Sequence, residues 1–407
     1  ATYETIRNFY QENYLPRRMT VIVTGDFKPE QAKQWVEKYF GDMRDVPGKP
    51  NEDRGKIKDL GPGQVVIPNP ENAQTNISIN VVDHYTHRPD TIEQRVKDFP
   101  GSMCRAMLNQ RLARMTRQPD CPFLAARIAK GSDMQVMDAF SVNVSAEPGK
   151  WKEAMRAVTE EVRRAAKYGF TKQELDEVIT SARAGLSQLQ STWATVSAKE
   201  MASSIIDCLD EDELITAPEE DIRAFEEGVK LVQAHPELCQ QELVNDFKSD
   251  RARIILTGTV PEGVDADQVR KAYDAALKTE VAKPADQKEL KFAYDKVGEP
   301  GSIIVQDTIE DIGVTTLTLS NGVRVNLKPI DYKKGTIAVA AAVDGGSLRL
   351  AGTPGLNTMT GAVMDMGGLE AHSVTDLERI LAGHVARVEF EASQDRFIFG
   401  GGTTPQD

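Results

Sequence analysis

Histidine and cysteine, two of the residue types that bind zinc, are few in this sequence, and their spacing decides what chemistry they could do. Only the stretch DHYTH brings two histidines, His84 and His87, to a HxxH spacing. This pair could hold an adventitious ion, but no Glu or Cys stands beside it, and a hydrolytic zinc site needs three protein ligands and an open position for water. We therefore predict no functional metal site in this strand-to-helix connection. The other histidines are His235, His372 and His384.

The isolated histidines and the cysteines favour structural roles. His235 lies at a predicted helix start and His384 at a predicted helix end, positions that solvent-facing histidines readily fill. No CxxC motif occurs, which excludes zinc-ribbon and CxxC redox chemistry. Because free cysteine is among the most buried residue types, we expect buried thiols. The four cysteines are Cys104, Cys121, Cys208 and Cys239.

Residues 208–228, CLDEDELITAPEEDIRAFEEG, form the densest acidic run. A cation site or a basic-peptide site is one interpretation, but the run lacks the Dx[DN]x[DN]G spacing of a calcium loop. We predict a solvated acidic face instead. The glycine-rich stretches DGGSLRL and DMGG lack the lysine of a P-loop and the GxGxxG spacing, so phosphate binding is not expected.

Composition is that of a globular protein. The 407 residues suggest two or three domains, and the 40% apolar content is enough for sizeable cores. The balance of 49 basic against 62 acidic residues, without a basic run, argues against nucleic acid and anionic membranes as partners. The longest small-apolar run, IAVAAAV from Ile337, is far shorter than the ~20 residues of a membrane helix, so no membrane span is predicted.

The elements that must position any site begin with an internal repeat. Residues 17–40, RRMTVIVTGDFKPEQAKQWVEKYF, predict a buried strand at Val21–Val23, a turn with Gly25 and an amphipathic helix. Residues 251–277 have the same outline, with Gly258 at the position of Gly25. The two glycines lie 233 positions apart, too far for a solenoid repeat and typical of a duplicated domain. We therefore expect the chain to begin near the end of one domain.

Between the two copies the sequence predicts one α+β module. The stretches TNISINVV, FLAARIAKG and DAFSVNVSAEP predict strands, and a long helix that Pro100 bends is expected to begin at Thr91. Thr171 and Glu174 have the capping-box pattern and start a helix directly after one that ends at Gly169. Further helices are expected at PEEDIRAFEEGVKLV, opened by Thr216, and at HPELCQQELVNDF.

A second module follows residues 281–311, whose mixed charge and lack of apolar period predict an extended connector. The stretch VTTLTLSNGVRVNLKPI has two apolar runs around Asn321-Gly322, a strong hairpin signal. We expect a strand at GTIAVAAAVDGGSLRL, helices at TPGLNTMTGAVMDMGG and SVTDLERILAGH, and a strand at ARVEFEAS. The chain is expected to end in FIFGGGTTPQD before this module closes a core.

These segments, in this order and spacing, resemble the pitrilysin/insulinase family of zinc metallopeptidases over nearly the whole chain. The matching stretches are FYQENYLPRRMTVIVTGDF, LNQRL, CPFLAARIAKG, AAKYGFTKQELDEV and LSNGVRVNLKP. The resemblance implies an α+β fold of duplicated metallopeptidase-like domains, each a mostly antiparallel sheet with helices packed on one face. Two such domains make a half, and a linker joins two halves.

The resemblance also implies that the chain is a middle fragment of such an enzyme. The expected parts are the C-terminal tail of a first, catalytic-type domain (1–45), a linker (46–64), a complete second domain (65–280), an inter-half linker (281–311) and the N-terminal part of a third, degenerate domain (312–407).

The same resemblance places the catalytic HxxEH motif and the zinc ligands upstream of Ala1, so no catalytic, metal or substrate-binding residue is assigned in this chain. Aligning GLNTMTGAVMDM on the family's G-L-x-H-x-x-E-H-M pattern puts Thr358 and Ala362 at the two His positions and Gly361 at the Glu position. A hydroxyl, a methyl group and a hydrogen atom cannot replace two imidazoles and a carboxylate. The third-domain helix is therefore expected to be inert.

The implied function is a non-catalytic, substrate-enclosing segment of a zinc endopeptidase that degrades extended or unfolded peptides between two halves. Its partners would be those peptides and the missing N-terminal and C-terminal domains of the same chain. The alternative is a catalytically dead homologue that serves as a structural or assembly subunit, and an intact upstream HxxEH would favour the enzyme. An unrelated α+β binding protein is disfavoured by the surroundings of the degenerate motif. Resemblance to two-half bacterial enzymes favours the periplasm or cell envelope.

Overall fold

A computed structural model describes residues 2–45, 54–59, 61–284, 290–296 and 298–407, which form two compact units. The first unit comprises Ala1–Lys167, Val196–Ala217 and Lys230–Val281, and the second comprises Tyr168–Thr195, Pro218–Val229 and Ala282–Asp407.

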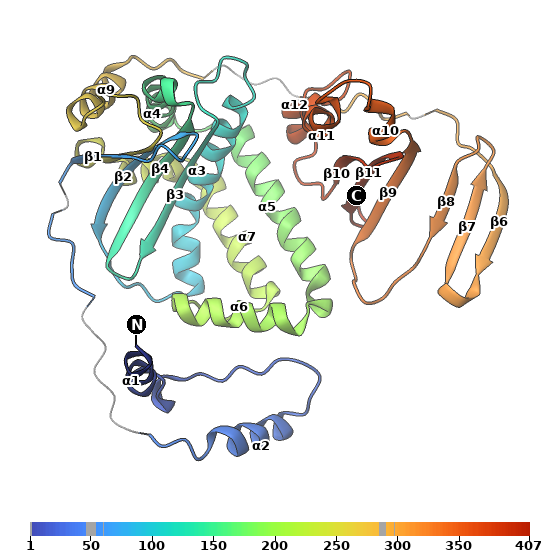
Figure 1. Cartoon of the computed structure of the whole chain (residues 1–407), viewed down its shortest axis with the longest axis horizontal. Helices are drawn as coiled ribbons and strands as arrows, with labels where there is room; N and C mark the ends of the chain where they lie inside the picture. The colour runs from blue at the N-terminus through green and yellow to red at the C-terminus, as the bar shows by residue number, and fades with distance from the viewer. Residues whose placement is uncertain (1, 46–53, 60, 285–289, 297) are drawn as a thin grey trace. The chain divides into compact units, whose positions relative to one another are not determined.

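A five-stranded sheet of order β1-β5-β2-β4-β3 is the centre of the first unit (Figure 1). Neighbouring strands are antiparallel except β1 and β5, which pair in parallel. Burial alternates along β2, so that Ile77, Ile79 and Val81 point to the covered face, as expected for a sheet with one face on a core. The strands are β1 (Gly63–Pro68), β2 (Thr75–His84), β3 (Ala125–Asp133), β4 (Met137–Ala146) and β5 (Arg253–Gly258).

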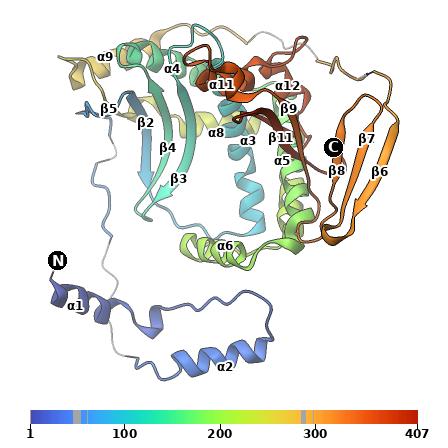
Figure 2. The ribbon, with the colours of Figure 1, turned by 45° about the vertical axis from the view of Figure 1, so that its right-hand side comes forward.

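Helices supply the other side of this core. Helix α3 runs beside β3 and contacts α8 (Figure 2), and the face of α4 predicted from its periodicity, Trp151, Met155, Val158 and Val162, is fully buried. Each such side chain contributes roughly 1.5–3 kcal/mol by leaving water. The helices are α1 (Tyr3–Asn13), α2 (Pro29–Phe40), α3 (Ile92–Met115), α4 (Trp151–Tyr168), α6 (Ala198–Glu211), α8 (Glu237–Asp246) and α9 (Ala266–Lys278).

Local helix signals place most boundaries correctly. The Thr91 hydroxyl accepts from the Gln94 amide at 3.1 Å, and Thr171 and Glu174 form the predicted capping box. The prediction that Thr216 opens α7 (Pro218–Ala234) is wrong, because Ala217 is the N-cap and the Thr216 hydroxyl accepts from the Arg95 guanidinium. Helix α6, within a stretch where no helix was expected, begins at a second capping box of Ser197 and Glu200.

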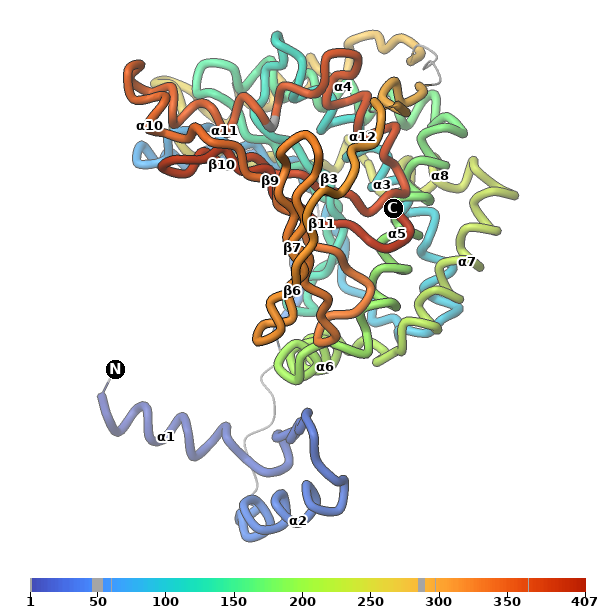
Figure 3. Tube along the Cα trace, turned by 90° about the vertical axis from the view of Figure 1, so that its right-hand side faces the viewer, coloured from blue at the N-terminus to red at the C-terminus, as the bar shows by residue number. Residues whose placement is uncertain are grey.

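The first copy of the repeat lacks its predicted strand. Val21 and Val23 are 40% and 42% exposed, and the chain runs without a ladder into α2 (Figure 3). A strand needs a neighbour for its backbone donors and acceptors, and no described residue pairs with this stretch. The prediction of a buried strand at Val21–Val23 is therefore wrong, whereas the second copy is confirmed as β5 and α9. Gly25 and Gly258 share a positive φ, +140° and +93°.

The second unit contains two antiparallel sheets, of orders β6-β7-β8 and β10-β11-β9. The predicted Asn321-Gly322 turn joins β7 to β8, with Gly322 at φ +88°. The extended-connector prediction is wrong for residues 303–309, which pair with β7 as β6. The C-terminal glycine run forms β11, a central strand that was not expected. The strands are β6 (Ile303–Ile309), β7 (Val314–Leu319), β8 (Arg324–Leu327), β9 (Ile337–Asp344), β10 (Arg387–Ala392) and β11 (Arg396–Thr403).

Besides residues 218–229 of α7, four helices belong to the described part of the second unit, and three of them follow the predictions for the C-terminal module and for the stretch that begins at Thr171. The helices are α5 (Lys172–Thr192), α10 (Gly346–Leu350), α11 (Leu356–Gly367) and α12 (Val374–Ile380). The first unit ends at Val281, beside the predicted limit of the second domain, but α5 and residues 218–229 group with the second unit. The five domain limits given above therefore stay predictions.

Candidate functional site

The three positions aligned with the zinc motif all lie on α11. Thr358 and Ala362 are four residues apart, so they share one face of the helix, and both are exposed. A Cβ added at Gly361 would meet no atom within 4 Å, so the site has room for a side chain there. Their assignment to the motif stays a prediction.

This donor set does not fit zinc. Thr358 offers only a neutral hydroxyl, and Gly361 and Ala362 offer no side-chain donor, whereas zinc in proteins takes imidazole, thiolate or carboxylate. Within the described part of the chain, no group of three or more His, Cys, Asp or Glu residues could hold a metal ion.

Within the HxxH pair, the ring of His87 contacts protein groups. His84 ends β2, and both histidines are exposed. The His87 ring has Nε2 3.7 Å from a carboxylate oxygen of Asp212 and Nδ1 3.3 Å from the Tyr85 hydroxyl. The structure thus brings His87 to the acidic run, a long-range contact that its HxxH spacing does not reveal.

The remaining predicted histidines lie where expected. His235 and His384 have side chains 59% and 56% exposed, and each pairs through Nδ1 with a carboxylate, that of Glu237 at 3.3 Å and that of Asp407 at 2.9 Å. His372 differs, because it is only 7% exposed. Of the cysteines, Cys104 and Cys239 are buried as predicted, but Cys121 and Cys208 are half-buried.

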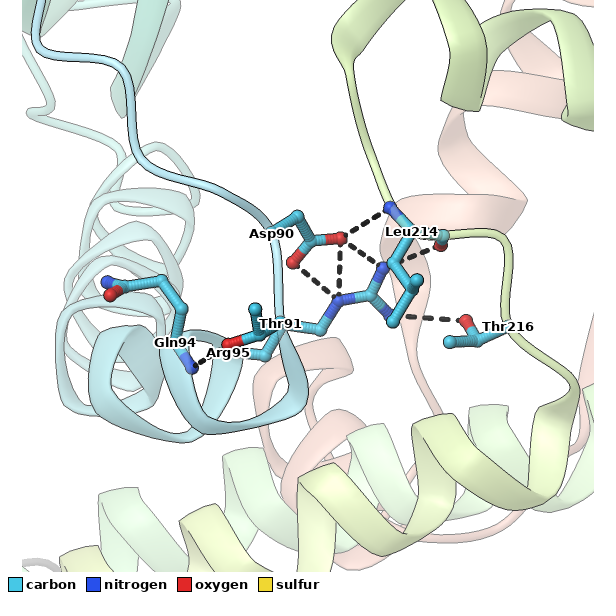
Figure 4. A network of polar contacts seen from close by, with 6 residues as sticks. All are labelled: Asp90, Thr91, Gln94, Arg95, Leu214 and Thr216. Carbon is cyan, nitrogen blue, oxygen red and sulfur yellow. Dashed lines mark hydrogen bonds and ion pairs between the residues drawn. The ribbon is translucent and has the colours of Figure 1, made fainter.

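A polar network ties the acidic run to the start of α3 (Figure 4). The Asp90 carboxylate accepts from Arg95 Nε at 2.8 Å and from the Leu214 amide at 2.9 Å. The same guanidinium donates to the Thr216 hydroxyl at 3.2 Å and to the Leu214 carbonyl at 3.0 Å. Hydrogen bonding by Arg95 holds the pKa of Asp90 below its ordinary value.

This network borders a cavity of about 450 Å³. Its lining carries seven carboxylates against three cationic side chains, so the potential there favours positive charge. Glu211, Asp212 and Glu213 belong to this lining and are exposed, in agreement with the predicted solvated acidic face. No pattern in the sequence predicts this network, since Asp90 and Leu214 are 124 residues apart.

Within the part of the chain that is described, no helix combines the length and apolar character that crossing a bilayer requires.

Comparisons with known proteins agree with the architecture. The family described as the Peptidase M16 inactive domain matches residues 1–96. The chain is similar in structure to the periplasmic protease PqqL from Escherichia coli, with a TM-score of 0.61, 18% identity, and coverage of 99% of this chain and 45% of that one. It is also similar to a mutant of the ferredoxin protease FusC in complex with Arabidopsis ferredoxin, with a TM-score of 0.58 and 16% identity. This match covers 99% of this chain and 45% of that one.

A predicted insulinase family protease from Yersinia pestis is also similar, with a TM-score of 0.58 and 17% identity over 67% of this chain and 59% of that one. No curated protein sequence matches the chain. The chain thus spans less than half the length of the first two solved structures. Its α+β fold is that of M16 peptidases, the pitrilysin/insulinase type, which confirms the predicted fold class and resemblance.

Proposed function

We propose that this chain is a non-catalytic, substrate-enclosing segment of a zinc-dependent endopeptidase that degrades extended or unfolded peptides between two halves. In this proposal residues 1–45 end a first, catalytic-type domain, 65–280 form the second domain, and 312–407 begin a third, degenerate domain. Residues 46–64 and 281–311 are the linkers, and the zinc ligands lie upstream of residue 1.

The observation that carries the proposal is the motif face of α11. It retains the helix and its exposed i, i+4 positions, but Thr358, Gly361 and Ala362 supply none of the side chains that the chemistry needs. The family described as the Peptidase M16 inactive domain matches residues 1–96, far from α11, and independently supports a non-catalytic role for that part of the chain.

The solved neighbours support a chain of two halves. PqqL and FusC are described as proteases. The structural match to each of them includes 99% of this chain but only 45% of the other protein. A first half of PqqL solved alone also matches, with a TM-score of 0.59 over 70% of this chain and 62% of that one. The description of PqqL as periplasmic supports a periplasmic or cell-envelope location.

A second candidate is a catalytically dead homologue that serves as a structural or assembly subunit. The unsuitable donors on α11 favour it as much as they favour the inert half of an enzyme. The two functions differ in what the upstream domain contains.

The test is a peptidase assay of the intact gene product on an unstructured peptide, with and without a chelator. We expect chelator-sensitive cleavage that is lost when the HxxEH glutamate of the upstream domain is replaced by glutamine. Cleavage that survives the chelator, or no cleavage from a folded protein with an intact HxxEH, would contradict the proposal. Absence of HxxEH together with folding would support the assembly subunit.

A further inference from the structure

His372 is a buried histidine between α11 and α12 that contacts the segment before β6. Its Nε2 accepts a hydrogen bond from the Ala293 amide at 2.8 Å. In return the Tyr294 hydroxyl accepts from the Ala371 amide at 2.8 Å. Each segment thus satisfies a backbone donor of the other with a side chain. We call these contacts, with the stacking of Phe292 described next, the aromatic latch.

Aromatic packing closes the latch. The His372 ring is stacked on Phe292, with centroids 5.7 Å apart and planes 13° apart, and Tyr294 approaches edge-on with centroids 5.9 Å apart. Phe292 and Tyr294 themselves form an edge contact at 5.7 Å. These two rings pack on His372, which is only 7% exposed, and aromatic pairs of this kind stabilise beyond the area that they bury.

The hydrogen bond at Nε2 fixes the protonation state of the ring. A ring nitrogen that accepts a hydrogen bond carries no hydrogen, so His372 in this arrangement is neutral with its hydrogen on Nδ1. A second proton would put an N–H on Nε2, pointing at the N–H of Ala293. The latch would then lose its central hydrogen bond, and the amide of Ala293, an exposed residue, would be left to water.

Charged groups around the ring do not offset this loss. On α12, Asp376 is close enough to His372 to interact with it electrostatically, but its carboxylate is engaged by the Ser373 amide at 3.1 Å and hydroxyl at 2.7 Å. Glu378 follows Asp376 on α12, and Arg379, on the same helix, pairs with Glu177 at 3.3 Å. On the opposing segment Tyr294 is the titratable group that faces the ring. Stacking on Phe292 remains possible in either protonation state.

We propose that His372 is a proton-operated latch, which holds residues 292–294 while the ring is neutral and releases them when the ring is protonated. The segment lies in the predicted inter-half linker, residues 281–311, so the latch sets how much of that linker is fixed. The inference rests on local contacts within one compact unit and goes beyond the proposed peptidase role.

The test is amide hydrogen exchange of the whole chain at pH 7.5 and pH 5, corrected for intrinsic exchange rates. We expect the protection factor of the Ala293 amide to fall at least about tenfold at pH 5, the effect of about 1.4 kcal/mol. In His372→Gln the side-chain oxygen can still accept from Ala293 but does not titrate, so the protection should be equal at both values. His384→Gln, at an exposed histidine, should retain the fall.

Equal protection of Ala293 in the unaltered chain at both pH values would overturn the proposal, as would a fall that persists in His372→Gln. If that variant does not fold, the imidazole nitrogens of the unaltered chain give the answer by NMR. The latch requires an unprotonated Nε2 at pH 7.5 and a doubly protonated ring at pH 5. A His372 ring that stays neutral at pH 5 would also overturn the proposal.

Discussion

The side chain of Asn109 pairs with the backbone of Ile128 in both directions. Its amide nitrogen donates to the Ile128 carbonyl at 2.9 Å, and its oxygen accepts from the Ile128 amide at 2.7 Å. Because β3 is an edge strand of the first sheet, these backbone groups have no further strand to bond. Asn109 on α3 therefore covers one point of the edge and fixes the helix to the strand.

Asn109→Leu should lower the free energy of unfolding by roughly 1–3 kcal/mol, because two buried backbone groups lose their partners. Urea denaturation measures this change. Gln110→Leu is the matched control, since the Gln110 side-chain oxygen is buried and has no hydrogen-bond partner in the described structure. Gln110→Leu should leave the free energy of unfolding unchanged or raise it. A decrease equal to that of Asn109→Leu would refute the assigned role of Asn109.

Gly258→Ala should lower the stability of the fold by more than the cost of placing alanine at a positive φ. Gly258 has φ +93°, and a Cβ there would lie 2.1 Å from the Gln74 carbonyl oxygen. Gly263 has φ +81° with nothing near its Cβ position, so Gly263→Ala reports the left-handed backbone cost of roughly 1–2 kcal/mol by itself. We expect the Gly258 variant to exceed that by at least about 1 kcal/mol. Equal melting temperatures for the two variants would contradict the close approach.

Asp90→Asn should destabilise the first unit at neutral pH by roughly 1.5–3 kcal/mol, since a charged hydrogen-bond acceptor is lost. The pKa of Asp90 is lowered by its hydrogen bond to Arg95, so its contribution is complete above the unfolded-state pKa near 4 and disappears as pH falls through the lower folded-state pKa. The stability difference between the two proteins should therefore shrink below about pH 4.

The control for this pH dependence is Asp45→Asn. Arg17 likewise lowers the pKa of Asp45 by hydrogen bonding, but both side chains are exposed, and such pairs add little. A pH-independent difference for Asp90→Asn would show that the carboxylate charge does not stabilise the folded unit.

A triple variant can restore the HxxEH side chains on α11. Its substitutions are Thr358→His, Gly361→Glu and Ala362→His. The triple variant should fold, because Gly361 has room for a side chain and glutamate favours helices. We expect no chelator-sensitive peptide cleavage by this chain with or without the changes, because no group of His, Cys, Asp or Glu among the described residues is placed to complete a zinc site. Zinc analysis after dialysis accompanies the assay. One equivalent of zinc in the unaltered chain, with cleavage, would overturn the proposed roles.

The four thiols should differ in reactivity. Burial raises the pKa of Cys104 to about 12 and that of Cys239 to about 11, and the thiolate is the reactive form. Iodoacetamide at pH 8 should therefore modify Cys121 and Cys208 at least about tenfold faster than the buried pair, as measured by mass spectrometry of peptides. Denaturant should abolish the difference. Equal labelling of all four in the folded chain would mean that the α3 and α8 contact opens readily.

Prediction from sequence succeeded where the signal is local. The capping box of Thr171 and Glu174 and the Asn321-Gly322 turn are set by neighbours in the chain, and alternation along β2 reports one buried face. It failed at Val21–Val23, where apolar residues form a strand only if another strand lies beside them. The glycine run of β11 carries no side-chain pattern, although it lies between two strands.

The candidate sites show the same division. The sequence alone predicts that zinc cannot bind at Thr358, Gly361 and Ala362, because a zinc ligand is defined by its side chain. The Arg95 network and the environment of His372 are not, because Ala293 lies 79 residues from the histidine that accepts its amide hydrogen. Contacts of this range depend on the packing of several elements.

Strand β5 is the last of its sheet in the chain, yet it lies between β1 and β2. During synthesis, residues 63–84 leave the ribosome almost 170 residues before the strand that joins them, as the pairing of Gly63 with Arg253 requires. Loop closure over such a distance is slow. Until then two strand edges are open to other chains, so the nascent protein passes through a stage in which it depends on chaperones or rapid elongation to avoid aggregation.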